Sequence, residues 1–260
     1  MLLTTISVLS FTLFGALYPL LTWTVRISQL NRGFHRFILG LSCIVGGVGV
    51  VFVFLISDTI PSNVRIGEVV WLISLLAVTG YYWNQESIKK WVITIPSIFG
   101  VMAFYRILSE IISGDLELFI ISLLGGFILC GALFSMILGH WYLNVVSLPI
   151  SLLKSTVKFL ILIVSLRFIW DMGFIIMGEV RYNGLPISMT QFLQTFDGFF
   201  LIFALFFGTL LPLILGILTL KTIAIQSTQS ATGLLYVIVI SVVMADLFYK
   251  YYLVQAELPL

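Results

Sequence analysis

The residues with the clearest chemical potential are charged side chains in the middle of long apolar stretches. Arg167 and Asp171 lie four residues apart, which places them on one face of a helix within pairing distance. Asp246 lies in another apolar stretch, and Lys250 follows it at the same spacing. At ~1.5 Å per residue, Asp171 and Asp246 fall at nearly the same depth along their helices. We therefore expect Arg167, Asp171 and Asp246 to cluster.

Such a cluster supports two hypotheses. A buried ion pair can simply lock two helices together. Alternatively, ionisable groups held away from water mark proton paths and sites for a polar headgroup such as a quinone. Trp170 lies on the stripe of the Arg167–Asp171 pair, and Asp197 opens the next apolar stretch, where it is placed to line an entrance. These two residues complete the set of quinone or proton candidates.

A second group of candidates lies at the ends of the apolar stretches. His140, Tyr142 and Asn144 follow the fifth stretch, and His35 precedes the second. Two histidines on one side can ligate a haem. The ligands of a membrane haem b project from within helices, however, so these rim positions argue against haem. The remaining interpretations are ordinary interfacial histidines and a polar site for a quinone or lipid headgroup.

Other chemistry finds no support in the sequence. Cys43 and Cys130 each lie within an apolar stretch and form no CxxC or Cys/His zinc spacing, so packing is the simplest role and no metal site is expected. There is no Walker loop, GxSxG, HExxH or Rossmann fingerprint, so no catalytic residue is assigned and enzyme activity stays open. No covalently bound cofactor is expected, and a net charge of +2 gives no reason to expect nucleic acid.

The elements that position these residues follow from composition. Hydrophobic residues make up 60% of the chain and charged residues only 9%, against about 25% in soluble domains. The apolar runs are continuous and reach the ~20 residues of a bilayer-spanning helix, so helices are expected rather than a barrel. We predict an all-α polytopic membrane protein, a single integral domain over residues 1–260 with eight transmembrane helices. The predicted spans are 2–25, 37–56, 67–83, 91–107, 118–139, 156–178, 196–219 and 232–254.

The charges in the connections predict an orientation in the lipid bilayer. Basic residues in short connections stay in the cytoplasm. One set of span ends holds eight of them, namely Arg26, Arg32, Arg36, Lys89, Lys90, Lys154, Lys158 and Lys221. The opposite set holds four, namely Arg65, Arg106, Arg181 and Lys250. Both termini are therefore predicted outside the cytoplasm, and the first run, which lacks signal-peptide features, is expected to be a retained helix.

A short internal similarity suggests a duplication. Residues 11–18, Phe-Thr-Leu-Phe-Gly-Ala-Leu-Tyr, match residues 127–134, Phe-Ile-Leu-Cys-Gly-Ala-Leu-Phe, at five of eight positions. A genuine repeat would relate halves 1–115 and 116–260, with four spans each and the same orientation. The alternative is that each Gly-Ala pair is a local packing notch, because small residues let helix backbones approach.

Eight spans, a candidate bundle duplication and a buried polar cluster together resemble the membrane subunits of the polysulfide-reductase (NrfD-type) class. The resemblance covers architecture and no sequence motif, so no family residue is transferred. It implies two four-helix bundles that pass electrons between quinone and a partner subunit without a cofactor of their own. The leading hypothesis is a membrane subunit of a respiratory or quinone-linked electron-transfer complex, with other membrane or peripheral redox subunits as partners. The alternatives are a small-solute or ion transporter or channel, and a structural or assembly subunit.

Overall fold

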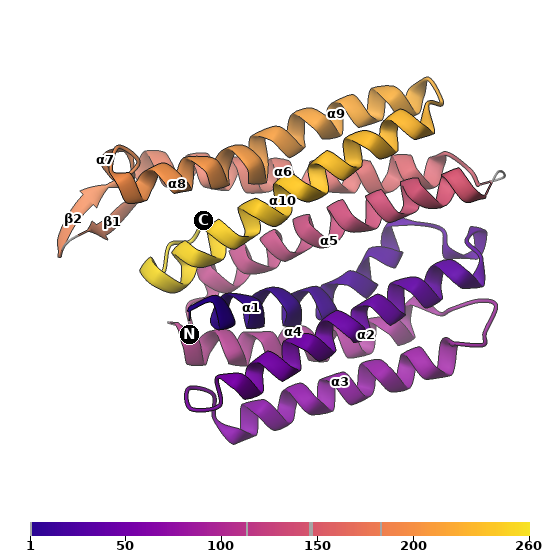
Figure 1. The fold of residues 1–260 in the computed structure, drawn as a ribbon, viewed down its shortest axis with the longest axis horizontal. Coiled ribbons are helices and arrows are strands. Elements are labelled where there is room, and N and C mark those ends of the chain that lie inside the picture. The colour runs from indigo at the N-terminus through magenta and orange to yellow at the C-terminus, as the bar shows by residue number, and fades with distance from the viewer. Residues whose placement is uncertain (1, 113, 146–147, 183) are drawn as a thin grey trace. The chain divides into compact units, whose positions relative to one another are not determined.

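The computed structural model describes residues 2–112, 114–145, 148–182 and 184–260. Within these residues, eight helical segments are long and apolar enough to span a membrane, which confirms the predicted fold class (Figure 1). They are α1 (Leu2–Leu17) continued by η1 (Tyr18–Thr24), α2 (Arg32–Leu55), α3 (Ser62–Tyr82), α4 (Lys90–Ile111), α5 (Leu116–Asn144), α6 (Ser151–Met177), α8 (Phe196–Leu205) continued by η3 (Phe206–Leu210) and α9 (Leu211–Ala224), and α10 (Thr228–Ala256). Most helices extend beyond the predicted spans, because a helix continues past the hydrocarbon core.

The surface of these helices is strongly apolar. Bulky side chains such as Ile44, Met102 and Ile169 are each more than 60% exposed, and similar residues recur on α3 and α10. Soluble proteins rarely expose apolar patches of this extent. Lipid hydrocarbon is the environment that suits such a surface, so the chain is a multi-pass membrane protein.

The chain divides into two compact units. Unit 1 comprises Met1–Gly114 and His140–Thr156, and unit 2 comprises Asp115–Gly139 and Val157–Leu260. The sequence repeat would instead assign residues 140–156 to the second half. Gly15 and Gly131 are the glycines of the two similar segments. Gly15 of α1 contacts α2, and Gly131 of α5 contacts α6, so each contacts the following long helix of its own unit. The repeat itself stays a prediction.

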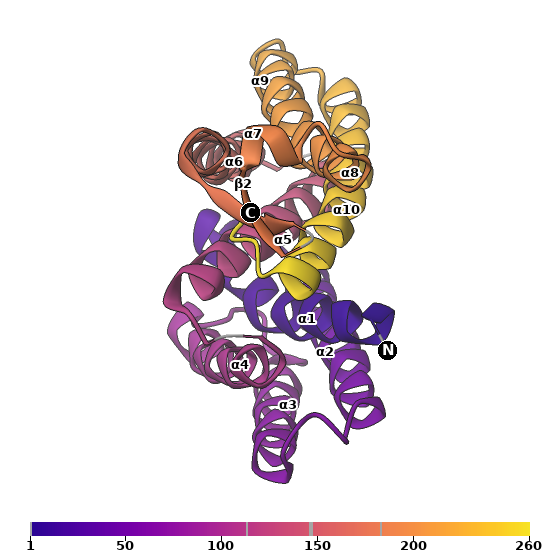
Figure 2. The same cartoon turned by 90° about the vertical axis from the view of Figure 1, so that its left-hand side faces the viewer.

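Close contacts at glycines hold unit 1 together. A Cβ on Gly15 would lie 2.7 Å from Gly46 Cα, and one on Gly49 would lie 2.8 Å from Thr12 N, so α1 and α2 cross with their backbones almost touching. The indole of Trp71 on α3 fills the centre of the unit and contacts Gly15, Gly46 and Gly100 of α1, α2 and α4. These four helices run side by side in both views (Figures 1 and 2).

Unit 2 is a ring of four helical segments that also meet at small residues. Contacts at glycines join α5 to α6, α6 to α9, α9 with η3 to α10, and α5 to α10. The contacting pairs are Gly131 with Leu160 and Ile163, Gly216 with Ile161, Gly208 with Ala245, and Gly139 with Thr232 and Leu235. Van der Waals contact at small residues is a main source of helix association in membranes, where lipid is as apolar as leucine.

The seventh span is not a regular α-helix. Its middle, η3, is a π-helical turn. Pro212 at the start of α9 has no N–H to donate to the carbonyl of Gly208, so the α-helical hydrogen-bond ladder is interrupted here. Single π-turns inside α-helices occur frequently at functional sites.

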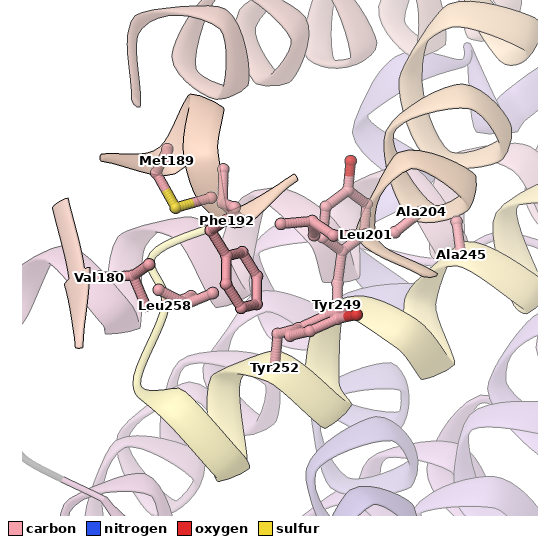
Figure 3. Packing of buried hydrophobic residues seen from close by; sticks show 10 residues of the cluster. Val180, Met189, Phe192, Leu201, Ala204, Ala245, Tyr249, Tyr252 and Leu258 are labelled. Carbon is pink, nitrogen blue, oxygen red and sulfur yellow. The ribbon is translucent and has the colours of Figure 1, made fainter. Parts of the chain in front are cut away.

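A small hairpin and the last residues of the sequence close one end of unit 2. β1 (Glu179–Tyr182) pairs antiparallel with β2 (Leu185–Ser188), and Ser188 forms a capping box with Gln191 at the start of α7 (Met189–Phe192). Phe192 lies against Tyr252 of α10, with ring centroids 6.2 Å apart (Figure 3). Leu258 and Leu260 fold back into the same apolar cluster. The sequence analysis treated the hairpin segment only as a connection between spans.

Candidate functional site

Arg167 and Asp171 form a buried ion pair on α6. Arg167 Nε donates to Asp171 Oδ1 at 3.0 Å, and the two side chains are 3% and 0% exposed. A second guanidinium nitrogen donates to the carbonyl of Ile121 on α5 at 2.9 Å. A Cβ on Gly125 would lie 3.3 Å from this guanidinium, so the glycine leaves it room. Helix α5 thus supplies both space and an acceptor for a cation that would otherwise be costly in the membrane.

Tyr249 of α10 connects the pair to the opposite side of unit 2. Its hydroxyl donates to Asp171 Oδ2 at 2.8 Å, and its ring lies 4.2 Å from the guanidinium carbon of Arg167. Asp171 therefore has a partner on each oxygen. Tyr249 also packs on Gly208 in the π-helical turn, where a Cβ would collide with its ring. The sequence analysis missed this tyrosine, because a tyrosine within an apolar stretch has no distinctive sequence pattern.

Asp246 pairs within its own helix. It accepts a hydrogen bond from Lys250, and both side chains are less than 10% exposed. Two small cavities of about 20 and 30 Å³ separate this pair from Arg167 and Tyr249, and both are lined by Arg167, Asp246 and Tyr249. A buried water needs only ~10–15 Å³ measured in this way, so each cavity has room for one or two waters. The expected cluster thus consists of two ion pairs, with water-sized cavities between them.

Trp170 does not join these ion pairs. It is 40% exposed, and its Nε1 donates to the carbonyl of Pro259 at 2.7 Å. It lines a groove of about 510 Å³ on the outside of unit 2, together with Gly173 and Phe174 of α6 and Glu117 of α5. The groove lies on the face of α6 opposite to Asp171, although Trp170 and Asp171 are adjacent in the sequence.

Asp197 lies apart from the ion pairs, in the first turn of α8. Its carboxylate accepts from Tyr182 of the hairpin at 3.0 Å, and its backbone carbonyl accepts from Tyr252. Its contacts therefore tie the hairpin to α8 and α10. An entrance role remains a prediction that these contacts neither require nor contradict.

The rim candidates do not form one site among the described residues. His35 is buried in the first turn of α2, with Nε2 3.2 Å from the carbonyl of Gln85. His140 is exposed, Tyr142 donates to the carbonyl of Pro149, and Asn144 donates to the carbonyl of His140 at 3.4 Å. Nowhere in the described residues do three His, Cys, Asp or Glu side chains come together as a metal site would require.

The network has two properties that matter for chemistry. Its charged groups are paired and hydrogen-bonded, which offsets part of the cost of holding them away from water. The cavities that can hold water are lined by Arg167, Asp246 and Tyr249 and, in one of them, by Lys250, and protons move along such chains of donors and acceptors. The two ion pairs alone are equally compatible with a structural lock between helices. What the neighbouring groove binds therefore distinguishes a chemical function from such a lock.

Comparisons with protein-family models, characterised proteins and solved structures find no match for the chain. The class of the molecule therefore rests on the fold alone. It is a polytopic α-helical membrane protein with eight candidate spans in the described residues and a buried network of charges in unit 2.

Proposed function

We propose that the chain is a membrane subunit of a quinone-linked electron-transfer complex. In this proposal unit 2 binds the quinone in the α6 groove, and the Arg167–Asp171–Tyr249 network serves its protons. Reduction of a quinone to a quinol takes up two electrons and two protons, so redox partner subunits carrying haem or iron–sulfur centres would supply the electrons. The observation that carries the proposal is that one segment of α6 borders both the groove and the network.

The groove suits an amphiphile with an apolar body. Its volume of about 510 Å³ falls within the ~300–1,000 Å³ of typical ligand pockets, and most of its lining is apolar. Gly173 opens the middle of the groove, because a Cβ there would meet nothing within 4 Å. Glu117 adds a carboxylate at one edge. An isoprenoid chain and a compact polar ring match this combination.

The structure offers a direct reporter for binding. Of the six tryptophans, Trp170 alone belongs to unit 2, and it lines the groove. Quinones quench tryptophan fluorescence on contact. Titration of decylubiquinone into the protein in lipid nanodiscs should therefore quench a component of the emission that the Trp170→Phe variant lacks.

A paired substitution makes the test specific. Gly173→Leu places a bulky side chain in the groove, at a position where its Cβ meets nothing within 4 Å, and should weaken decylubiquinone binding at least tenfold. Gly80→Leu on α3 is the matched control, because a Cβ there also meets nothing within 4 Å, and it should bind as the unchanged protein does. Equal affinities for the two variants, or quenching that is independent of Trp170, would show that decylubiquinone does not bind in the groove and would contradict the proposal.

A second function has an observation of its own. The π-helical turn η3 packs on Tyr249 beside the water-sized cavities, an arrangement that also suits a path for protons or small cations through unit 2. Such a transporter should act alone. Purified protein in liposomes that dissipates an imposed proton gradient without quinone or partner chains would favour this alternative over the quinone proposal.

A further inference from the structure

Unit 1 contains a carboxyl group that the charge network does not use. Glu68 of α3 is 0% exposed, and neither of its carboxyl oxygens has a hydrogen-bond partner among the described residues. It is the seventh residue of α3, about 6 Å from the middle of the helix at ~1.5 Å per residue.

Glu68 lies on the face of α3 that packs into unit 1. The buried residues of this helix form one stripe, and Glu68 stands within it, one turn before Trp71. The indole of Trp71 contacts the glycines of the three other helices, so this stripe faces the centre of the bundle. A leucine side chain would need only apolar contacts at this position, whereas a carboxyl group also needs hydrogen-bond partners.

None of the recorded ion pairs of the described residues involves Glu68. Helix α1 has no ionisable side chain, and beyond its first two turns α2 has only Cys43. On α4, Tyr105, Arg106 and Glu110 are exposed. Arg65, one turn before Glu68 on α3, lies over the ring of Phe54, 5.8 Å from its centroid, and its Nε has no hydrogen-bond partner among the described residues. Within the described residues Glu68 forms no ion pair.

Other polar atoms near the centre of unit 1 also lack partners. Trp71 Nε1 and Ser97 Oγ are buried without a hydrogen-bond partner in the described chain. A Cβ on Gly100 would collide with the indole of Trp71, and Ser97 is one turn away from Gly100 on the buried face of α4. The α3–α4 contact therefore carries three unsatisfied polar side chains at successive levels of the bundle, whereas native proteins leave few such groups.

We propose that Glu68 is a proton-binding site of unit 1, a neutral carboxylic acid whose proton exchanges with solvent during opening of the bundle. An unpaired carboxylate in an apolar interior is so costly that the group takes up a proton instead. Ionisable residues within spans are functional by default, since an apolar side chain would serve stability better. The inference does not depend on the proposed quinone function, because it concerns the other unit.

A neutral acid within a membrane has a characteristic reactivity towards hydrophobic carbodiimides. The proton of the acid moves to one carbodiimide nitrogen while a carboxyl oxygen bonds to the central carbon. An acyl shift from oxygen to nitrogen then gives a stable N-acylurea that retains every atom of the reagent. Asp171 should resist this reaction because its carboxylate is paired with Arg167, and it serves as an internal control.

Two measurements on the full-length protein in nanodiscs test the proposal. Infrared spectra at neutral pH should show a carboxylic-acid C=O band that shifts in deuterated buffer and is absent from the Glu68→Gln variant. Dicyclohexylcarbodiimide should add its whole mass to the peptide that contains Glu68, and sodium ions should not slow the reaction. A spectrum without an acid band assignable to Glu68 would overturn the proposal, and so would a band that never exchanges. Protection by sodium would overturn it in favour of a cation site.

Stability gives an independent readout. Glu68→Gln keeps the shape of the neutral acid, so its melting temperature should remain unchanged. Glu68→Leu should raise the melting temperature, because it removes an unsatisfied polar group from an apolar centre. A large loss of stability in both variants would show that an ionised Glu68 has a partner, and the proposal would then fail.

Discussion

The Arg167–Asp171 pair allows the energetics of the network to be tested by a double-mutant cycle. Arg167→Met removes a charge-assisted hydrogen bond, worth about 1.5–3 kcal/mol. It also removes a desolvated cation–π contact 4.2 Å from the ring of Tyr249, worth about 2 kcal/mol. The expected cost is therefore about 3–5 kcal/mol of unfolding free energy, the range found when one member of a buried pair is removed.

The double variant should cost much less than the two single variants together. Asp171→Leu leaves the guanidinium of Arg167 buried without its carboxylate partner. It should lower the unfolding free energy by about as much as Arg167→Met does. In the double variant the remaining unsatisfied group is the hydroxyl of Tyr249, which costs about 1–3 kcal/mol. The coupling between the two positions should therefore reach several kcal/mol.

Steric trapping in bicelles measures these unfolding free energies at equilibrium. The Arg32–Glu86 pair is the matched control, because its side chains are 41% and 83% exposed. Arg32→Met should cost about 0–1 kcal/mol, as surface pairs do. If Arg167→Met costs no more than Arg32→Met, or if the single costs simply add, the charges of unit 2 do not form one coupled network.

Two further predictions concern helix packing and orientation. Gly49→Ala should lower the unfolding free energy by about 1–3 kcal/mol, because its Cβ would lie 2.8 Å from Thr12 N. Gly67→Ala meets nothing within 4 Å and should be neutral or stabilising by up to ~1 kcal/mol, and equal losses in the two variants would contradict the close α1–α2 crossing. In a variant without native cysteines, Asp58→Cys should react with an impermeant maleimide in intact cells, and Glu86→Cys only after lysis. The reverse pattern would invert the predicted orientation.

The sequence predicted the helices well because their signal is simple. A run of about 20 apolar residues has few alternatives in a bilayer, and all eight predicted spans fall on long apolar helices. The spacing of Arg167 and Asp171 likewise placed them within reach, because helix geometry fixes which side chains share a face. Both successes rest on local rules that need no knowledge of how helices meet.

The contacts between helices could not be predicted in the same way. The partners of Arg167 on α5 and α10 are a backbone carbonyl and a tyrosine ring, neither of which has a distinctive sequence pattern. Trp170 shares the helical stripe of the ion pair in sequence, yet its indole faces the outside of unit 2. The hairpin at 179–188 was missed because its two strands of four residues carry no long periodic signal.

Glu68 and Asp171 show why burial has to be known before a charge in a membrane sequence can be interpreted. Both are carboxyl groups at 0% exposure, but Asp171 has Arg167 and Tyr249 as partners whereas no partner is found for Glu68 in the described chain. A paired carboxylate is held ionised by its neighbours, so removing a neighbour should be costly. An unpaired acid is stable only with its proton, so replacing it with an amide should be harmless. The opposite responses expected of Arg167→Met and Glu68→Gln therefore separate the two kinds of site in one set of stability measurements.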